Sequence, residues 1–188
     1  MFDFSGLPGD SLGARLVLLV VGFLLTSILG GGLTALFQHL GAAAQRKQAR
    51  AQQVWGERRQ AFETVSRLMD RRLYAVRQFA FALDNRQRLG ADFVEKRLEE
   101  YRTVLQEWNG SINSNLALLE IYYGPPCREE FDSVLGKEFV DTGALVEDAY
   151  RAGAPSGVGA RIEALKHRVY HFNLRLLRIL DDGGAALT

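Results

Sequence analysis

Positions 16–45, between Arg15 and Arg46, carry no formal charge, and this segment constrains the fold more than any other feature of the sequence. Its centre, positions 16–37, reads LVLLVVGFLLTSILGGGLTALF. As an α-helix this stretch rises about 33 Å, enough to cross a hydrocarbon core of about 30 Å. A cleaved signal peptide is the alternative, but the leader is acidic (Asp3 and Asp10) and the apolar run is too long for one. We therefore predict a transmembrane helix over 14–41.

The charges that flank this helix predict its orientation. The leader 1–13 contains two acidic residues, whereas Arg46, Lys47 and Arg50 follow the span in a basic juxtamembrane stalk over 42–60. The positive-inside rule places the short N-terminus outside the cell and the C-terminal part in the cytoplasm. We therefore expect a single-pass protein of the cell membrane, in contact with the lipid bilayer. The single cysteine, Cys127, excludes an internal disulfide and fits a reducing compartment.

Small and hydroxyl residues form one narrow face of the predicted span. They lie in two adjacent rows, one of Gly22, Thr26, Gly30 and Thr34 and the other of Ser27, Gly31 and Ala35. Such a face lets helix backbones approach closely, so it predicts helix association within the membrane. The face is also compatible with the lining of a pore, with Gln38 and His39 at its cytoplasmic mouth, or with the ordinary abundance of glycine in membrane helices.

The remainder of the chain predicts an all-α fold, an antiparallel bundle of about four helices over 61–182 with a flexible tail over 183–188. Helices are expected up to position 88, from 92, over 128–151 and over 158–181. They are separated by glycine- and proline-containing breaks at 89–91, 124–126 and 153–157. Short connections of this kind favour up-and-down neighbours.

The second of these helices has a heptad pattern typical of a coiled-coil seam. Two sets of residues recur every seven positions: Leu98, Leu105, Ile112 and Leu119, and Val94, Tyr101, Trp108, Asn115 and Tyr122. Asn115 interrupts the apolar seam, and a polar residue at such a position can fix the register of the helices. The partner of this seam is either a helix of the same chain, which we favour, or a second copy.

Charge is segregated along the domain although the whole chain has a net charge of only +1. Positions 46–88 hold 11 basic and 4 acidic residues, positions 91–150 hold 5 and 13, and positions 151–182 hold 6 and 3. The balances are +7, −8 and +3. We interpret them as helices that complement one another within the bundle, rather than as a dedicated docking surface. The near-neutral total gives no reason to expect a DNA partner.

The last predicted helix contains a possible ligand set for a metal. Glu163, His167 and His171 are spaced by four residues and would share one side of the helix. This set lacks further ligands, so we interpret the two histidines as surface or interface residues and expect no cofactor.

The same helix contains Arg161 and His167 as Arg-x5-His. This spacing resembles the Arg-x(4–6)-His motif of the HEPN-domain ribonucleases, which are also helical bundles. The resemblance implies a metal-independent ribonuclease in which Arg161 and His167 act on the scissile phosphate at a dimer interface. Ile162 stands where the family usually has a polar residue, which departs from the pattern. Membrane-anchored bundles with HEPN-like motifs also occur among CRISPR accessory proteins, so under this alternative RNA is a partner and the process is antiviral defence.

Signatures of other enzyme classes are missing from the sequence. The run Gly30-Gly31-Gly32 lies inside the predicted span and has no lysine after it, so it is not a phosphate-binding loop. Our leading hypothesis is therefore a non-enzymatic membrane protein that acts as an oligomeric or accessory subunit. Its expected partners are further copies of itself or other membrane-protein subunits.

Overall fold

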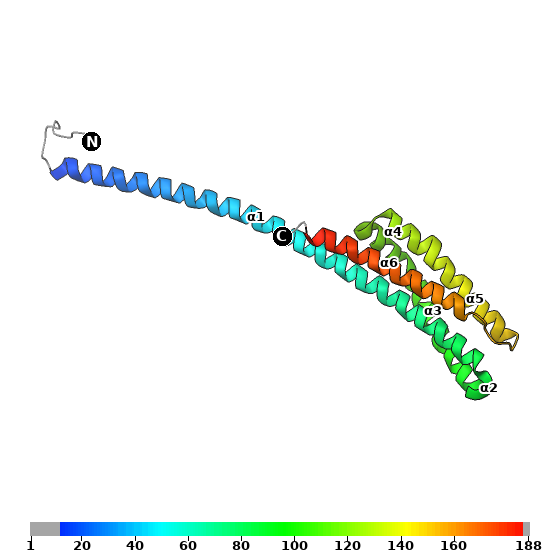
Figure 1. Ribbon diagram of the computed structural model, residues 1–188. Helices are drawn as coiled ribbons and strands as arrows, with labels where there is room; N and C mark the ends of the chain where they lie inside the picture. Colours follow the sequence, from blue (N-terminus) through cyan, green and yellow to red (C-terminus); the bar gives the residue numbers. More distant parts are fainter. Residues whose placement is uncertain (1–11, 186–188) are drawn as a thin grey trace. The chain divides into compact units, whose positions relative to one another are not determined.

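The computed structural model describes the backbone of residues 12–185 and the side chains of residues 19–24 and 45–182 (Figure 1). Seven helical segments follow one another, and the described residues contain no strand. The segments are α1 (Leu12–Asp84), α2 (Arg86–Leu89), α3 (Ala91–Tyr123), α4 (Pro125–Glu129), the π-helix η1 (Glu130–Gly136), α5 (Lys137–Arg151) and α6 (Gly159–Ala185). The chain divides into two compact units, residues 1–50 and 51–188.

The first unit contains the predicted membrane span, which is helical throughout as part of α1. Leu19 and Phe23 are strongly exposed, at 74% and 71% of their surface. In the part of the chain that the structure describes in full, no helix is long and apolar enough to cross a membrane. Positions 25–44, which form most of the predicted span, lie outside the residues whose side chains are described. The leader up to position 11 lies outside the described residues altogether.

The second unit is an all-α bundle, as the sequence predicts. Pairs of residues between α1 and α3 run in opposite directions along the two helices: Tyr122 bonds Glu57, Arg71 bonds Glu107, and Phe79 stacks on Tyr101. Ion pairs join η1 and α5 to α6 in the same antiparallel sense, and Asp84 at the end of α1 accepts bonds from Ser156 just before α6. In Figure 1, α6 (orange to red) lies beside α5 and the second half of α1. The prediction of an all-α helical bundle is confirmed, and these two sets of neighbouring helices are antiparallel.

The helix ends follow from the residues at the predicted breaks. Gly90 and Gly124 have φ values of +86° and +85°, a conformation that side chains with a Cβ rarely adopt, so the helices end there. Pro125 occupies the first turn of α4, where its missing N–H costs no hydrogen bond, so this helix begins before position 128. α1 ends at Asp84 instead of position 88, and α6 continues to Ala185, so the predicted tail is helical at its start.

The core consists of two clusters of buried side chains. One is centred on Trp108, whose ring lies 5.3 Å from the rings of both Phe131 and Phe139. The other surrounds Phe79 and Tyr101, whose ring centroids lie 5.6 Å apart. The heptad of α3 is confirmed in part: Val94, Leu98, Tyr101, Trp108, Asn115 and Leu119 are buried as predicted. Leu105, Ile112 and Tyr122 are only partly buried, and Tyr123 is buried at the end of the helix in place of Tyr122. Its seam packs against helices of the same chain.

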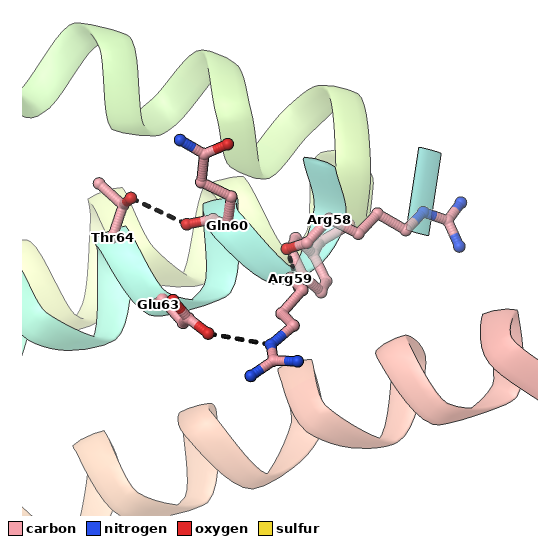
Figure 2. Close-up of polar contacts among 6 residues, drawn as sticks. Arg58, Arg59, Gln60, Glu63 and Thr64 are labelled. Atoms are coloured by element: carbon pink, nitrogen blue, oxygen red, sulfur yellow. Dashed lines mark hydrogen bonds and ion pairs between the residues drawn. The ribbon is translucent and has the colours of Figure 1, made fainter. Parts of the chain in front are cut away.

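The close-up in Figure 2 shows polar contacts within α1 between residues one helical turn apart. Arg59 Nε donates to Glu63 Oε1 at 3.0 Å, and Thr64 Oγ1 donates to the carbonyl of Gln60 at 2.8 Å. In each pair the two residues lie one helical turn apart and are exposed, so each contact contributes only a few tenths of a kcal/mol. The position of this part of α1 is therefore set mainly by its buried face, which includes Ala61, Val65 and Met69.

Candidate functional site

The segregated charges meet as a row of ion pairs that joins α6 to η1 and α5. Arg161, Arg168 and Arg175 recur every seven residues on α6, and they pair with carboxylates of the preceding helical segments. Arg161 lies 3.3 Å from Asp141, Arg168 lies 2.9 Å from Glu138, and Arg175 pairs with Glu130. This confirms the interpretation that basic and acidic helices complement one another within the bundle. Most of the arginines of α6 are thereby occupied internally.

The structure places Arg161 and His167 on different sides of α6. Arg161 Nε donates to Thr142 Oγ1 at 3.2 Å, and its Nη2 reaches Asp141, so the guanidinium faces α5. His167 instead borders a hollow between α1 and α6. Six residues correspond to about 1.7 turns of helix, which separates the two side chains around the axis. Within one chain the side chains of Arg161 and His167 therefore do not face a common site where both could contact one phosphate group.

Two of the three possible metal ligands, Glu163 and His171, make other contacts in the structure. Glu163 accepts a hydrogen bond from Lys166 Nζ at 2.9 Å, and this bond lowers the pKa of its carboxyl. The ring of His171 lies edge-on to Tyr170, 5.7 Å away. Among the described residues, no three histidine, cysteine, aspartate or glutamate side chains are grouped so as to hold a metal ion.

The hollow between α1 and α6 has a volume of about 520 Å³ and a mixed lining. It is lined by Asp70, Leu73, Lys166, His167, Val169, Tyr170 and Asn173. Ser66 Oγ bonds Asn173 Oδ1 at 2.9 Å and thereby joins the two helices. Partial burial against the two helices raises the pKa of the Asp70 carboxyl. The carboxyl, imidazole and phenol groups are open to solvent, so the hollow offers polar contacts rather than an enclosed reaction site.

The centre of the bundle contains a buried arginine that the sequence analysis did not single out. Arg72 is only 2% exposed, and its guanidinium lies 4.4 Å from the ring of Trp108 and 5.1 Å from that of Phe139. Its Nε and Nη1 have no hydrogen-bond partner among the described residues. Burial lowers the pKa of Arg72 to about 10, because removal from water disfavours the charged form. The two aromatic faces supply the attraction that holds the cation in place.

The pattern of buried residues on α1 shows that Arg72 occupies a core position although arginine is a charged residue. Leu73 is the apolar residue beside Arg72, but Leu73 is only partly buried and Arg72 takes the central position. Buried residues recur at Val65, Met69, Arg72, Val76, Phe79 and Leu83, with spacings of four and three. This heptad spacing is the signal that would have found Arg72.

Three further residues singled out in the sequence are structural. Asn115 is 2% exposed and lies on the seam of α3, bordering a hollow beside α1. Cys127 is buried, and burial raises the pKa of its thiol, which disfavours the reactive thiolate. Trp108 joins α3 to η1 and α5, as an anchor of the bundle.

Tyr123 joins α3 to α1 by a hydrogen bond, and its ionisation is expected to lower the stability of the bundle at alkaline pH. Its hydroxyl donates to the carbonyl of Arg58 at 2.8 Å, and burial raises the pKa of Tyr123 to about 12. Because the folded-state pKa lies above the usual value near 10, the stabilisation is complete below pH 10 and is lost as the pH rises to 12. We expect the free energy of unfolding to fall by about 2 kcal/mol over this range. Denaturant titration should show a smaller fall for Tyr123→Phe, and an equal fall would contradict this assignment.

The residues predicted to act at the membrane lie in the first unit. Arg46, Lys47 and Arg50 are exposed. Gly22 belongs to the described part of α1, whereas the side chains of Thr26, Ser27, Gly30, Gly31, Thr34 and Ala35 lie outside the described residues.

Comparison with protein-family models, with curated proteins and with solved structures finds no match to this chain. The class of the protein is therefore defined by its own architecture, an all-α bundle whose first core helix is the same helix that contains the apolar segment.

Proposed function

We propose that this protein is a single-pass, membrane-anchored helical bundle that acts as an oligomeric or accessory subunit of a membrane assembly. The observation that supports it most is the absence of charge from positions 16–45. The helix that contains this segment, α1, also supplies core residues such as Val65 and Phe79. In this proposal one continuous helix, α1, supplies both the membrane anchor and a core helix of the bundle.

The basic residues after the segment support this topology. Arg46, Lys47 and Arg50 are exposed, and Glu57 is the first acidic residue that follows them. Each basic side chain near an anionic lipid surface contributes about 1 kcal/mol of attraction. With these residues at the cytoplasmic leaflet, the N-terminus lies outside and the bundle lies in the cytoplasm.

The two rows of small residues supply the contact between subunits in this proposal. Lipid tails are as apolar as leucine, so helices in a bilayer associate through close backbone packing and hydroxyl hydrogen bonds. Gly30 and Gly31 lie at the centre of the two rows. A pore is the more specific form of the same assembly, with this face turned toward a central channel.

Replacing Gly30 and Gly31 together by leucine tests the assembly directly. The added side chains keep the helices apart, so we expect the native mass in mild detergent to fall to that of one subunit. Gly32→Leu is the matched control, because at about 100° per residue Gly32 lies about 150° around the helix from the midpoint between Gly30 and Gly31. If the double variant and the control keep the same mass, the small-residue face is not the contact. Ion flux through liposomes that is lost in the double variant alone would identify a pore.

The ribonuclease alternative predicts a different result. Because Arg161 is bound to Asp141 and Thr142, we expect the purified protein to leave single-stranded and structured RNA intact. Arg161→Ala should leave the amount of intact RNA unchanged. It should also change the free energy of unfolding only slightly, since an exposed ion pair contributes about 0–1 kcal/mol. Cleavage by the folded wild-type chain that both Arg161→Ala and His167→Ala abolish would overturn the non-enzymatic proposal.

A further inference from the structure

Polar contacts between α1 and α6 flank the hollow that these two helices form. On one side of it Ser66 Oγ donates a hydrogen bond to Asn173 Oδ1 at 2.9 Å. On the other side the hydrogen bond from Lys166 lowers the pKa of the Glu163 carboxyl, and the charge of Arg77 on α1 adds to this shift. The two helices therefore run antiparallel beside the hollow, as Figure 1 shows. The volume of about 520 Å³ falls within the range of about 300–1,000 Å³ that small-molecule sites occupy.

The nearby cations act on Glu163. Lys166 Nζ donates to Glu163 Oε2 at 2.9 Å, so this lysine has its counter-ion on its own helix. The charges of Arg77 and His167 also lower the pKa of the Glu163 carboxyl, after the larger effect of Lys166. The charge of Lys166 is therefore compensated, although its side chain lines the hollow.

Asp70 supplies the carboxyl group that lines the hollow, and it has no counter-ion in the part of the chain that the structure describes. None of the described residues forms a hydrogen bond or an ion pair with it. Partial burial raises the pKa of this carboxyl, so its charged form is less stable there than in water. A cation bound beside it would stabilise the charged form, because an opposite charge within about 4–6 Å favours ionisation.

Apolar and aromatic side chains share the lining with this carboxyl group. Leu73 is partly buried and Val169 is buried, and both border the hollow. Tyr170 is 56% exposed, and the ring of His171 lies edge-on to its ring. The face of an aromatic ring attracts a cation. The lining is therefore suited to a ligand that carries one positive charge on a hydrocarbon body.

We propose that the hollow between α1 and α6 binds a small organic ammonium ion. The Asp70 carboxylate pairs with the ammonium group, and Leu73, Val169 and the ring of Tyr170 contact the hydrocarbon part. An anionic ligand of the same size is disfavoured, because it meets the uncompensated charge of Asp70. All of these residues belong to the second unit, so binding of the ligand does not depend on the membrane anchor.

A series of three ligands that differ in charge tests the proposal. Phenethylammonium, phenethyl alcohol and hydrocinnamate share a phenyl ring and a two-carbon arm, which ends in an ammonium, a hydroxyl and a carboxylate group. Each is titrated calorimetrically into the full-length protein in mild detergent, and a titration into detergent alone is subtracted. We expect phenethylammonium to bind at least tenfold more tightly than the other two. Equal affinities, tighter binding of hydrocinnamate, or no binding of phenethylammonium at about 10 mM would overturn the proposal.

Replacing Asp70 identifies the group that pairs with the ammonium ion. We expect Asp70→Asn to weaken phenethylammonium binding at least tenfold, to the level of phenethyl alcohol. The variant should unfold at the same denaturant concentration as the wild type or a higher one, because it removes a partly buried charge. Asp132→Asn is the matched control, since Asp132 is an exposed aspartate on η1 that does not line the hollow. Wild-type affinity in Asp70→Asn, or equal losses in both variants, would overturn the proposal.

Replacing Tyr170 tests the aromatic contact. Tyr170→Leu keeps an apolar side chain but removes the ring, so we expect the dissociation constant of phenethylammonium to rise about threefold. Tyr74→Leu is the matched control, because Tyr74 is 61% exposed and borders a different hollow. Equal dissociation constants in the two tyrosine variants would overturn the placement of the Tyr170 ring in the site.

Discussion

Gly143→Ala is expected to destabilise the bundle by about 3 kcal/mol, because the new methyl group has no space. A Cβ at Gly143 would lie 2.1 Å from the hydroxyl oxygen of Tyr101 and 3.3 Å from its Cζ. Tyr101 is only 3% exposed and stacks on Phe79, so its ring cannot turn aside at low cost. Overpacking of this kind costs about 1–3 kcal/mol, and sometimes more. Denaturant unfolding followed by circular dichroism measures the effect.

The hydroxyl of Tyr101 provides the control for this prediction. Tyr101→Phe removes the atom that lies closest to the added methyl group, so the double variant should regain most of the stability lost by Gly143→Ala. Gly110→Ala is the matched glycine control, since its Cβ meets open space, and it should stabilise the folded subunit by about 1 kcal/mol. Equal effects of Gly143→Ala and Gly110→Ala would contradict the packing described around Tyr101.

Trp108→Ala is expected to cost about 3–5 kcal/mol, the usual range for removing a large buried aromatic side chain. The change removes the stacking on Phe131 and Phe139. It also removes the nearest aromatic face from the Arg72 guanidinium, which lies 4.4 Å from the indole ring. The loss is measured as the change in the free energy of unfolding.

Arg72→Met separates these two contributions. Replacing a buried charge by an apolar side chain of similar length is often neutral or stabilising, so we expect this variant to be at least as stable as the wild type. In the Arg72→Met background, Trp108→Ala should cost about 1–2 kcal/mol less, because no cation then loses its aromatic partner. The same cost in both backgrounds would show that the guanidinium gains nothing from the indole.

The breaks at Gly90 and Gly124 could be predicted because a single glycine determines each of them, and most of the seam of α3 could be predicted from its seven-residue repeat. Gly90 and Gly124 adopt a backbone conformation that favours glycine, and a glycine in a polar context signals a break. The π-helix η1 was not predicted. Phe131, Leu135 and Phe139 are all buried at spacings of four, and the wider turn of a π-helix keeps such residues on one face. A spacing of four occurs in ordinary helices too, so the sequence alone does not reveal the bulge.

The candidate site residues were predictable as residue types but not as neighbours. The spacing of Arg161 and His167 fits a ribonuclease motif, yet the partner of Arg161 depends on which helix packs against that side of α6. The hydrophobic pattern of α1 favours Leu73 as a core residue because leucine is apolar. Arg72 takes that place because two aromatic rings from α3 and α5 meet it there, which is a tertiary effect.

Alkaline extraction of isolated membranes measures most directly whether residues 14–41 anchor this chain. We expect the full-length protein to remain in the membrane pellet at alkaline pH, because an apolar helix that spans the bilayer is not released by loss of charge contacts. The control is a variant with Val20→Arg and Leu24→Arg, since each arginine within a span costs about 2.5–3.5 kcal/mol on insertion. This variant should move to the soluble fraction. Release of the wild-type chain to the same extent as the double-arginine variant would contradict membrane anchoring.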